Sequence, residues 1–160
     1  MRRLIINFGL SLLRTYWSIV NPISVGVRAI VRDHEGQVLL VRHVYGDDRL
    51  HLPGGGVKRR ETLVGGLRRE LKEETGLEIL ADEHELQLLG VFTNFHEGKS
   101  DHVSVFVVDP DQWKGDLQAD DLEIEKLNFE SDTDLPPDVS PGTARRLAEF
   151  RGERQITFEW

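Results

Sequence analysis

The chain has 160 residues, a length that suits one domain with a hydrophobic core. Its formal net charge of −8 argues against a general nucleic-acid coat protein, but it allows a local anion site because bound cations dominate the field around them. The absence of cysteine excludes disulfides and thiol catalysis, and the six histidines lack the close paired spacing that a structural zinc site needs.

Near the N-terminus two arginines precede an apolar run over residues 4–13. This run is too short to span a bilayer, contains polar residues and is not followed by a small-residue cleavage site. We therefore predict no transmembrane segment and a cytoplasmic location. One helical stripe carries four apolar side chains: Ile5, Phe8, Leu12 and Ile19. It predicts an amphipathic helix within residues 1–22 that docks on its own domain or on the second subunit of a homodimer, or alternatively rests on a membrane surface.

Apolar runs of strand length follow this segment. They predict strands at residues 25–31 and 37–41, with the turn at 33–36 joining them into a hairpin. A short strand at 50–52 leads to a glycine-rich turn and a helix. Further strands are expected at 86–95, 102–108 and 122–129, and a last helix at 143–150 after Pro141. Charged loops at 96–101 and 116–121 separate these strands.

The helix after the glycine turn carries an unusual face. Glu70, Glu73 and Glu74 recur at the three- and four-residue spacing of neighbours on a helix, where like charges repel by a few tenths of a kcal/mol per pair, about 0.2–0.5. A cation is therefore expected between them. Oxygen ligands of this kind select Mg²⁺ first and Mn²⁺ second. The leucines of the helix gather on an adjoining arc and are predicted to pack on the core.

Glycines accompany this face. Pro53 and the three glycines after it can bring the main chain close to a ligand. Gly66 lies one turn before Glu70 on the same arc, although glycine inside a helix costs roughly 1 kcal/mol. We expect its missing side chain to leave room for the metal and phosphates.

Residues 55–77 read GGVKRRETLVGGLRRELKEETGL and resemble the Nudix box, the signature of the Nudix hydrolase family. Nine positions fall on the pattern without insertion or deletion: Gly55, Glu61, Arg69, Glu70, Leu71, Glu73, Glu74, Gly76 and Leu77. The resemblance implies an α+β fold in which a mixed β-sheet is sandwiched between α-helices. We assign this domain to residues 23–160, with the N-terminal amphipathic helix as an addition.

The resemblance also implies an activity: metal-dependent hydrolysis of a phosphoanhydride bond in a nucleoside diphosphate linked to another moiety, by in-line attack of a metal-activated water. The alternative is a catalytically silent module of the same fold that binds or senses a nucleotide. All box carboxylates are present, which favours the enzyme.

The roles implied for the box residues are as follows. The metal ligands are Glu70, Glu73, Glu74 and a backbone carbonyl at Gly55. The catalytic set comprises Glu70 and Glu73, with Arg69 and Glu61 orienting the carboxylates. Four residues remain candidates for the general base: Glu70, Glu73, Glu123 and Glu125.

Other residues are candidates for contact with a nucleotide-type small-molecule substrate. They are Arg42, Lys58, Phe95, Glu123 and Glu125. Lys58 belongs to a run of three cations, 58–60, where many family members carry an acidic residue and a glycine. This run is either a solvated loop or a contact for an anionic substrate.

Overall fold

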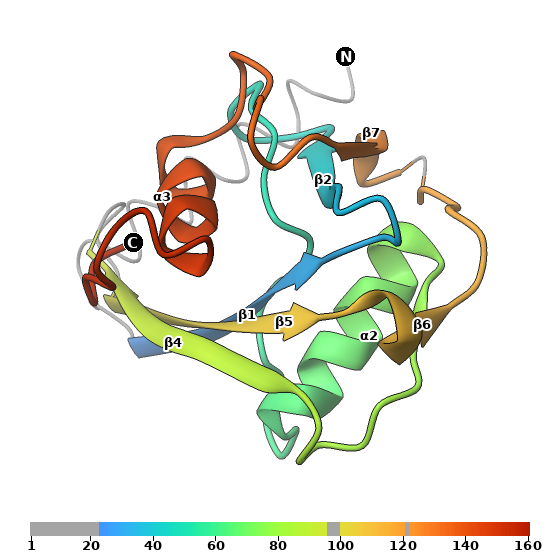
Figure 1. Cartoon of the computed structure of the whole chain (residues 1–160). Coiled ribbons are helices and arrows are strands. Elements are labelled where there is room, and N and C mark those ends of the chain that lie inside the picture. The colour runs from blue at the N-terminus through green and yellow to red at the C-terminus, as the bar shows by residue number, and fades with distance from the viewer. Residues whose placement is uncertain (1–22, 96–99, 121) are drawn as a thin grey trace.

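The computed structural model describes residues 23–95, 100–120 and 122–160. A three-stranded sheet forms its centre, with strand order β1-β5-β4. Strand β1 (Ile23–Val31) runs parallel to β5 (Ser100–Val108), and β4 (Gln87–Asn94) pairs antiparallel with β5. Helix α2 (Leu63–Thr75) lies on one side of this sheet and α3 (Pro141–Phe150) on the other (Figure 1). The predicted α+β class with a mixed sheet between helices is confirmed. The predicted N-terminal helix lies outside the described residues.

Two small antiparallel sheets complete the fold. Strand β2 (Val38–His43) pairs with β7 (Ile124–Glu130), and β3 (Glu78–Ile79) pairs with β6 (Trp113–Lys114). A 3₁₀ turn, η2 (Pro110–Gln112), precedes β6.

The predicted hairpin of the first two strands is wrong in its pairing. The turn forms, with the Gly36 N–H donating to the Asp33 carbonyl at 3.1 Å, but the strands share only one bridge, Arg32 to Val38. Strand β1 pairs with β5 instead, and β2 pairs with β7. The second half of β1 explains the difference, because its residues contribute to the core clusters on both faces of the sheet when β1 lies beside β5. The short strand predicted at 50–52 is present only as isolated bridges of Leu50 and His51.

The core consists of two clusters on the two faces of the sheet. Val27, Ala29 and Val31 of β1 belong to the cluster that includes Leu67 and Leu71 of α2. Ile30, which points to the other face, belongs to the cluster that includes Leu147 of α3. Leu67 and Leu71 thus hold α2 against the sheet, as predicted, and the glutamates lie at the border of the packed interior. Leu63, predicted to pack on the core with them, is instead 37% exposed because it begins the helix at the edge of the core.

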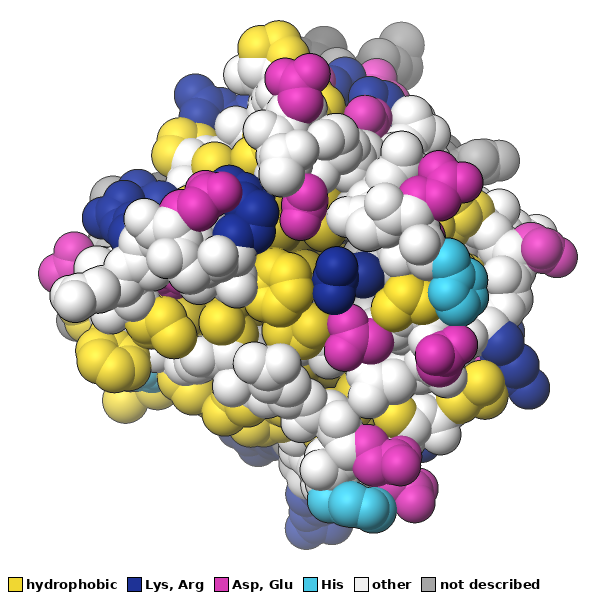
Figure 2. Space-filling view, in the orientation of Figure 1, with side chains coloured by type: hydrophobic (Ala, Val, Ile, Leu, Met, Phe, Trp, Pro, Cys, Tyr) yellow, Lys and Arg dark blue, Asp and Glu magenta, His cyan; other side chains and the backbone are white. Residues whose placement is uncertain are grey.

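Strand β4 forms an edge of the central sheet. Figure 2 shows hydrophobic side chains gathered on the face of the molecule on which β4 lies in Figure 1, and Leu88 and Val91 are the exposed large hydrophobic residues of the strand. The C-terminal tail covers part of this edge: the Thr93 N–H donates to the Phe158 carbonyl at 2.7 Å, and the Trp160 N–H donates to the Thr93 carbonyl at 2.9 Å.

Helix α3 begins at Pro141 after the capping residue Ser140. Arg146 of this helix is fully buried, and its guanidinium donates a hydrogen bond to the Glu149 carboxylate at 2.8 Å. The same guanidinium lies 3.8 Å from the centre of the Phe92 ring. This ion pair joins the helix to the sheet and to the tail. Within the described ranges, no helix is both long and apolar enough to cross a membrane.

Candidate active site

Helix α2 is defined at both ends by its own sequence. The Thr62 hydroxyl accepts a hydrogen bond from the Gly65 N–H at 2.9 Å, and Gly76 ends the helix with a φ of 77° in the left-handed region. Val64, Leu67 and Leu71 are buried against the sheet. The rotation of the helix is therefore fixed, and the carboxylate face is directed by core packing on the opposite side.

Arg69 holds three carboxylates together. Its Nε and Nη2 donate to the two oxygens of Glu61 at 2.8 and 2.9 Å, and its Nη1 donates to Glu70 at 2.6 Å and to Glu73 at 3.1 Å. A fifth bond runs from Nη2 to the Gly56 carbonyl at 2.9 Å. These hydrogen bonds lower the pKa of Glu61 to about 2 and raise the pKa of Arg69. The planar guanidinium thus acts as a clamp that contacts all three carboxylates at once.

The two glycines near the clamp serve different purposes. A Cβ on Gly55 would stand 2.7 Å from the Glu70 carboxylate, so any other residue here would require that carboxylate to move from its position beside Arg69. A Cβ on Gly66 would stand 3.2 Å from Glu61. In this structure the close neighbour of Gly66 is therefore the Glu61 carboxylate that Arg69 binds, and the expectation that Gly66 leaves room for metal and phosphates stays a prediction.

Glu74 occupies the most enclosed position on the carboxylate face. Its side chain is 4% exposed and accepts a hydrogen bond from the Gly54 N–H at 2.7 Å. Burial raises its pKa to about 7, and the negative charges of Glu70 and Glu123 add to that rise, while Arg28 and the Gly54 N–H oppose it. This carboxyl would be ionised at neutral pH far more readily with a bound cation beside it.

A group of polar residues that the sequence analysis did not select surrounds Glu74. The Nε2 of His43 lies 3.5 Å from the Glu74 carboxylate, and the His43 ring lies 5.4 Å from that of Tyr45. Burial and the charge of Arg28 lower the pKa of His43 to about 4, so this histidine is neutral at physiological pH. Arg28 itself donates to the Leu52 carbonyl at 2.8 Å. An arginine in the otherwise apolar run of β1 is the one sequence signal that points to this group.

His51 belongs to the same group. Its Nε2 lies 2.7 Å from the Asp47 carboxylate, and its ring lies 6.5 Å from that of His43. Burial lowers the pKa of His51, and the hydrogen bond with Asp47 partly offsets that effect. The region around Glu74 is thus lined by three rings, and Arg28 supplies a positive charge there.

The structure brings only some of the predicted substrate residues to this site. Glu123 is near enough for its charge to raise the pKa of both Glu74 and Tyr45. Arg42 instead pairs with Asp138, on the opposite face of β2 from His43. Phe95 is 69% exposed at the end of β4.

The last two predicted residues lie at the margins. Glu125 is exposed on β7. The backbone N–H of Lys58 donates to Glu61 at 2.7 Å, which places that residue beside the Arg69 clamp.

The chemistry of the donor atoms present suits a hard divalent cation, although the described side chains are not arranged around one point. They offer carboxylate oxygens from Glu70, Glu73 and Glu74, which Mg²⁺ and Mn²⁺ prefer, and the first two already share one cationic partner, the Arg69 guanidinium. Across the described ranges, no three acidic or histidine side chains converge at metal-ligand geometry. The carbonyl of Gly55, predicted as a fourth ligand, accepts a hydrogen bond from the Val27 N–H at 2.9 Å and so has one lone pair left.

Comparisons with known proteins agree with this arrangement. A sheet held between two helices, with a glycine turn leading into a carboxylate-bearing helix, defines an α+β domain built around an acidic site. The family model described as NUDIX domain matches residues 22–150. The chain therefore belongs to the Nudix family, and the resemblance seen in the sequence is confirmed.

Individual relatives are more distant. An RNA pyrophosphohydrolase of Saccharophagus degradans is 43% identical over 54 residues, which is 34% of this chain and 31% of that protein. The chain thus spans less than a third of the length of that relative. Among solved structures, a MutT protein from Methanosarcina mazei is 24% identical with a TM-score of 0.69, covering 85% of this chain and 98% of that one. A MutT NUDIX hydrolase from Burkholderia pseudomallei is 23% identical with a TM-score of 0.68, covering 78% and 95%. At these identities the structural likeness shows the fold.

Proposed function

We propose that this protein is a Mg²⁺- or Mn²⁺-dependent hydrolase that cleaves a phosphoanhydride bond in a nucleoside diphosphate linked to another moiety. The observation that carries the proposal is the clamp of Arg69 on Glu61, Glu70 and Glu73. It fixes carboxylates at one place on α2 with an orientation that a solvated helix face would not need. The relative named RNA pyrophosphohydrolase and a solved structure titled ADP-ribose pyrophosphatase, from Streptococcus suis, support the same bond class.

Glu70, Glu73, Glu74 and the Gly55 carbonyl would hold the ion. A bound divalent ion neutralises phosphate charge and lowers the pKa of a water molecule. Arg69 keeps the Glu70 and Glu73 carboxylates pointing to one side of the helix. Gly55 brings the main chain against Glu70.

The proton of the attacking water passes to a carboxylate. The candidates are Glu70, Glu73, Glu123 and Glu125, and the pH dependence of kcat separates them. The glutamine variant that removes the general base loses the acidic limb of the profile, whereas the other variants keep it.

The activity is tested by product release from a panel of nucleotide sugars, nucleoside triphosphates, dinucleoside polyphosphates and ADP-ribose, with Mg²⁺, with Mn²⁺ and with EDTA. We expect turnover with the metals and none with EDTA. Glu73→Gln should lower kcat at least about 100-fold. The matched control is Glu78→Gln, which neutralises an exposed carboxylate that pairs with Lys72 outside the site. Nucleotide binding without turnover across the panel would identify the silent binding module instead.

A further inference from the structure

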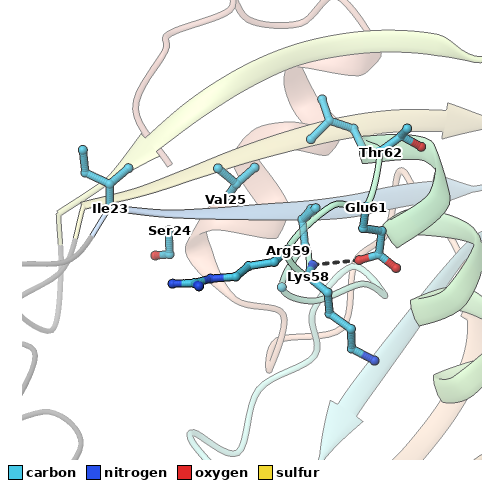
Figure 3. Close-up of a pocket in the computed structure, with 10 residues that line it drawn as sticks. Ile23, Ser24, Val25, Lys58, Arg59, Glu61 and Thr62 are labelled. Carbon is cyan, nitrogen blue, oxygen red and sulfur yellow. Dashed lines mark hydrogen bonds between the residues drawn. The ribbon is translucent and has the colours of Figure 1, made fainter.

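A pocket lies beside the clamp, between the start of β1 and the turn that leads into α2 (Figure 3). Its volume is about 680 Å³. We call it the basic pocket; its walls come from residues 23–25 and from residues 56–59 and 61–63. Lys58 and Arg59 are its two cationic residues.

Arg59 is the cation best placed to meet a ligand in this pocket. Figure 3 shows its side chain extended along the pocket toward Ser24, while the Lys58 side chain points to the opposite side. Over the described ranges, neither cation forms an ion pair. Because the whole chain carries a net charge of −8, an anion needs such local positive charge to bind here.

The opposite wall of the basic pocket is apolar. Ile23 is 77% exposed and Val25 is 42% exposed, and both project from the first residues of β1. A cation facing apolar side chains suits a charged group attached to a ring or a carbon chain, and suits a free hydrated ion less well. An organic phosphate has this character.

The basic pocket is joined to the acidic site by shared residues. Glu61 lines the pocket and accepts a hydrogen bond from the Nε of Arg69 at 2.8 Å. The same guanidinium donates a hydrogen bond to Glu70 at 2.6 Å. Gly56 also lines the pocket and accepts from Arg69 at 2.9 Å. The Arg69 side chain therefore connects Glu61 and Gly56 of the pocket wall to the Glu70 carboxylate. A nucleotide whose reacting phosphorus lies at the carboxylates can place another phosphate in the pocket.

We propose that the basic pocket, through Arg59, binds a phosphate group of the substrate that lies outside the scissile anhydride. This inference rests on the proposed function and narrows it. Substrates with a third phosphate or a phosphorylated second moiety bind better than nucleotide sugars whose second moiety is uncharged.

The test compares ATP with ADP-ribose, which share the ADP part and differ in whether a phosphate or an uncharged ribose is attached to it. Arg59→Ala should raise the KM for ATP about tenfold, the loss expected for one charge-assisted hydrogen bond, and should raise the KM for ADP-ribose less than about twofold. Arg59→Lys should restore most of the ATP affinity. A kcat within about twofold of wild type in each variant would place the effect in binding.

Arg60→Gly is the matched control. Arg60 carries the same charge on the same turn but does not line the basic pocket, and its φ of 64° is one that glycine adopts freely. We expect its KM values to equal those of wild type. Equal changes for both substrates in Arg59→Ala, or an Arg60→Gly effect as large as that of Arg59→Ala, would overturn the proposal.

A failure of the proposed function gives a different result. If wild type hydrolyses neither compound, calorimetric titration with inorganic tripolyphosphate tests the pocket by itself. Weaker tripolyphosphate binding in Arg59→Ala than in Arg60→Gly supports the pocket, and equal binding refutes it.

Discussion

Glu74→Gln offers a direct measure of how strongly burial perturbs the pKa of the most enclosed carboxyl on the α2 face. The side chain is 4% exposed, and burial raises its pKa from 4.5 to about 7. At roughly 1.4 kcal/mol per pH unit, that rise corresponds to about 3 kcal/mol. Because the folded state binds the proton more tightly than the unfolded state, this residue makes the metal-free protein less stable as pH rises from about 4.5 to about 7.

His43 opposes this trend. Its pKa is lowered from 6.5 to about 4, so its contribution to stability is lost as pH falls through that range. In the wild type the contributions of Glu74 and His43 to the pH dependence of the unfolding free energy therefore have opposite signs and largely cancel. Glu74→Gln keeps an acceptor for the Gly54 N–H but removes the pH dependence that the carboxyl contributes. As pH rises from 4.5 to 7.5, the unfolding free energy of the variant should therefore increase by about 3 kcal/mol relative to that of wild type.

The assay is urea denaturation at four pH values across this range, in EDTA. Glu73→Gln is the matched control, since it makes the same substitution on the same helix face at a side chain that is 54% exposed. Adding Mg²⁺ at pH 8 should stabilise wild type and not Glu74→Gln. Parallel pH profiles of wild type and Glu74→Gln would refute the reasoning.

Three further variants test the clamp, the turn and the buried ion pair. Arg69→Lys keeps the charge but loses the bidentate fork, so kcat should fall about 10–100-fold in steady-state assays without loss of the far-ultraviolet circular dichroism signal. Gly55→Ala should weaken Mg²⁺ binding at least about tenfold in calorimetry, because the new Cβ would stand 2.7 Å from the Glu70 carboxylate. Gly56→Ala is its control: a Cβ at that position has no atom within 4 Å, so Mg²⁺ affinity should change little. Arg146→Met leaves a buried carboxylate unpaired and should cost about 3–5 kcal/mol of unfolding free energy, while Lys72→Met, which breaks an exposed pair, should cost less than about 1. Equal losses in the two members of either matched pair would contradict the corresponding argument.

Much of the site was predictable because its residues are close together in the sequence. Glu70, Glu73 and Arg69 meet through spacings of one and four residues on one helix, and Glu61 is only eight residues before Arg69. Helical periodicity also predicted that Leu67 and Leu71 of α2 face the core, although it placed the exposed Leu63 there as well. These interactions depend on local geometry, which the order of the residues specifies.

Other features depended on contacts between distant segments. Arg42 meets Asp138 across 96 residues, and β1 pairs with β5 in place of its neighbour β2. Which strand pairs with which depends on how much of each sheet face is buried in the folded protein, and a short stretch of sequence does not contain this information.

The sequence by itself determined that this protein carries a carboxylate helix held by an arginine and a glutamate, because turn residues, caps and helical spacing act over a few residues. Only the tertiary structure decided what surrounds that helix: Arg28 and His43 from two separate strands around Glu74, and Arg59 facing the start of β1 across the basic pocket. The physical reason is that burial and long-range charge depend on which strands become neighbours, and this is settled only when the two core clusters close on either side of the sheet.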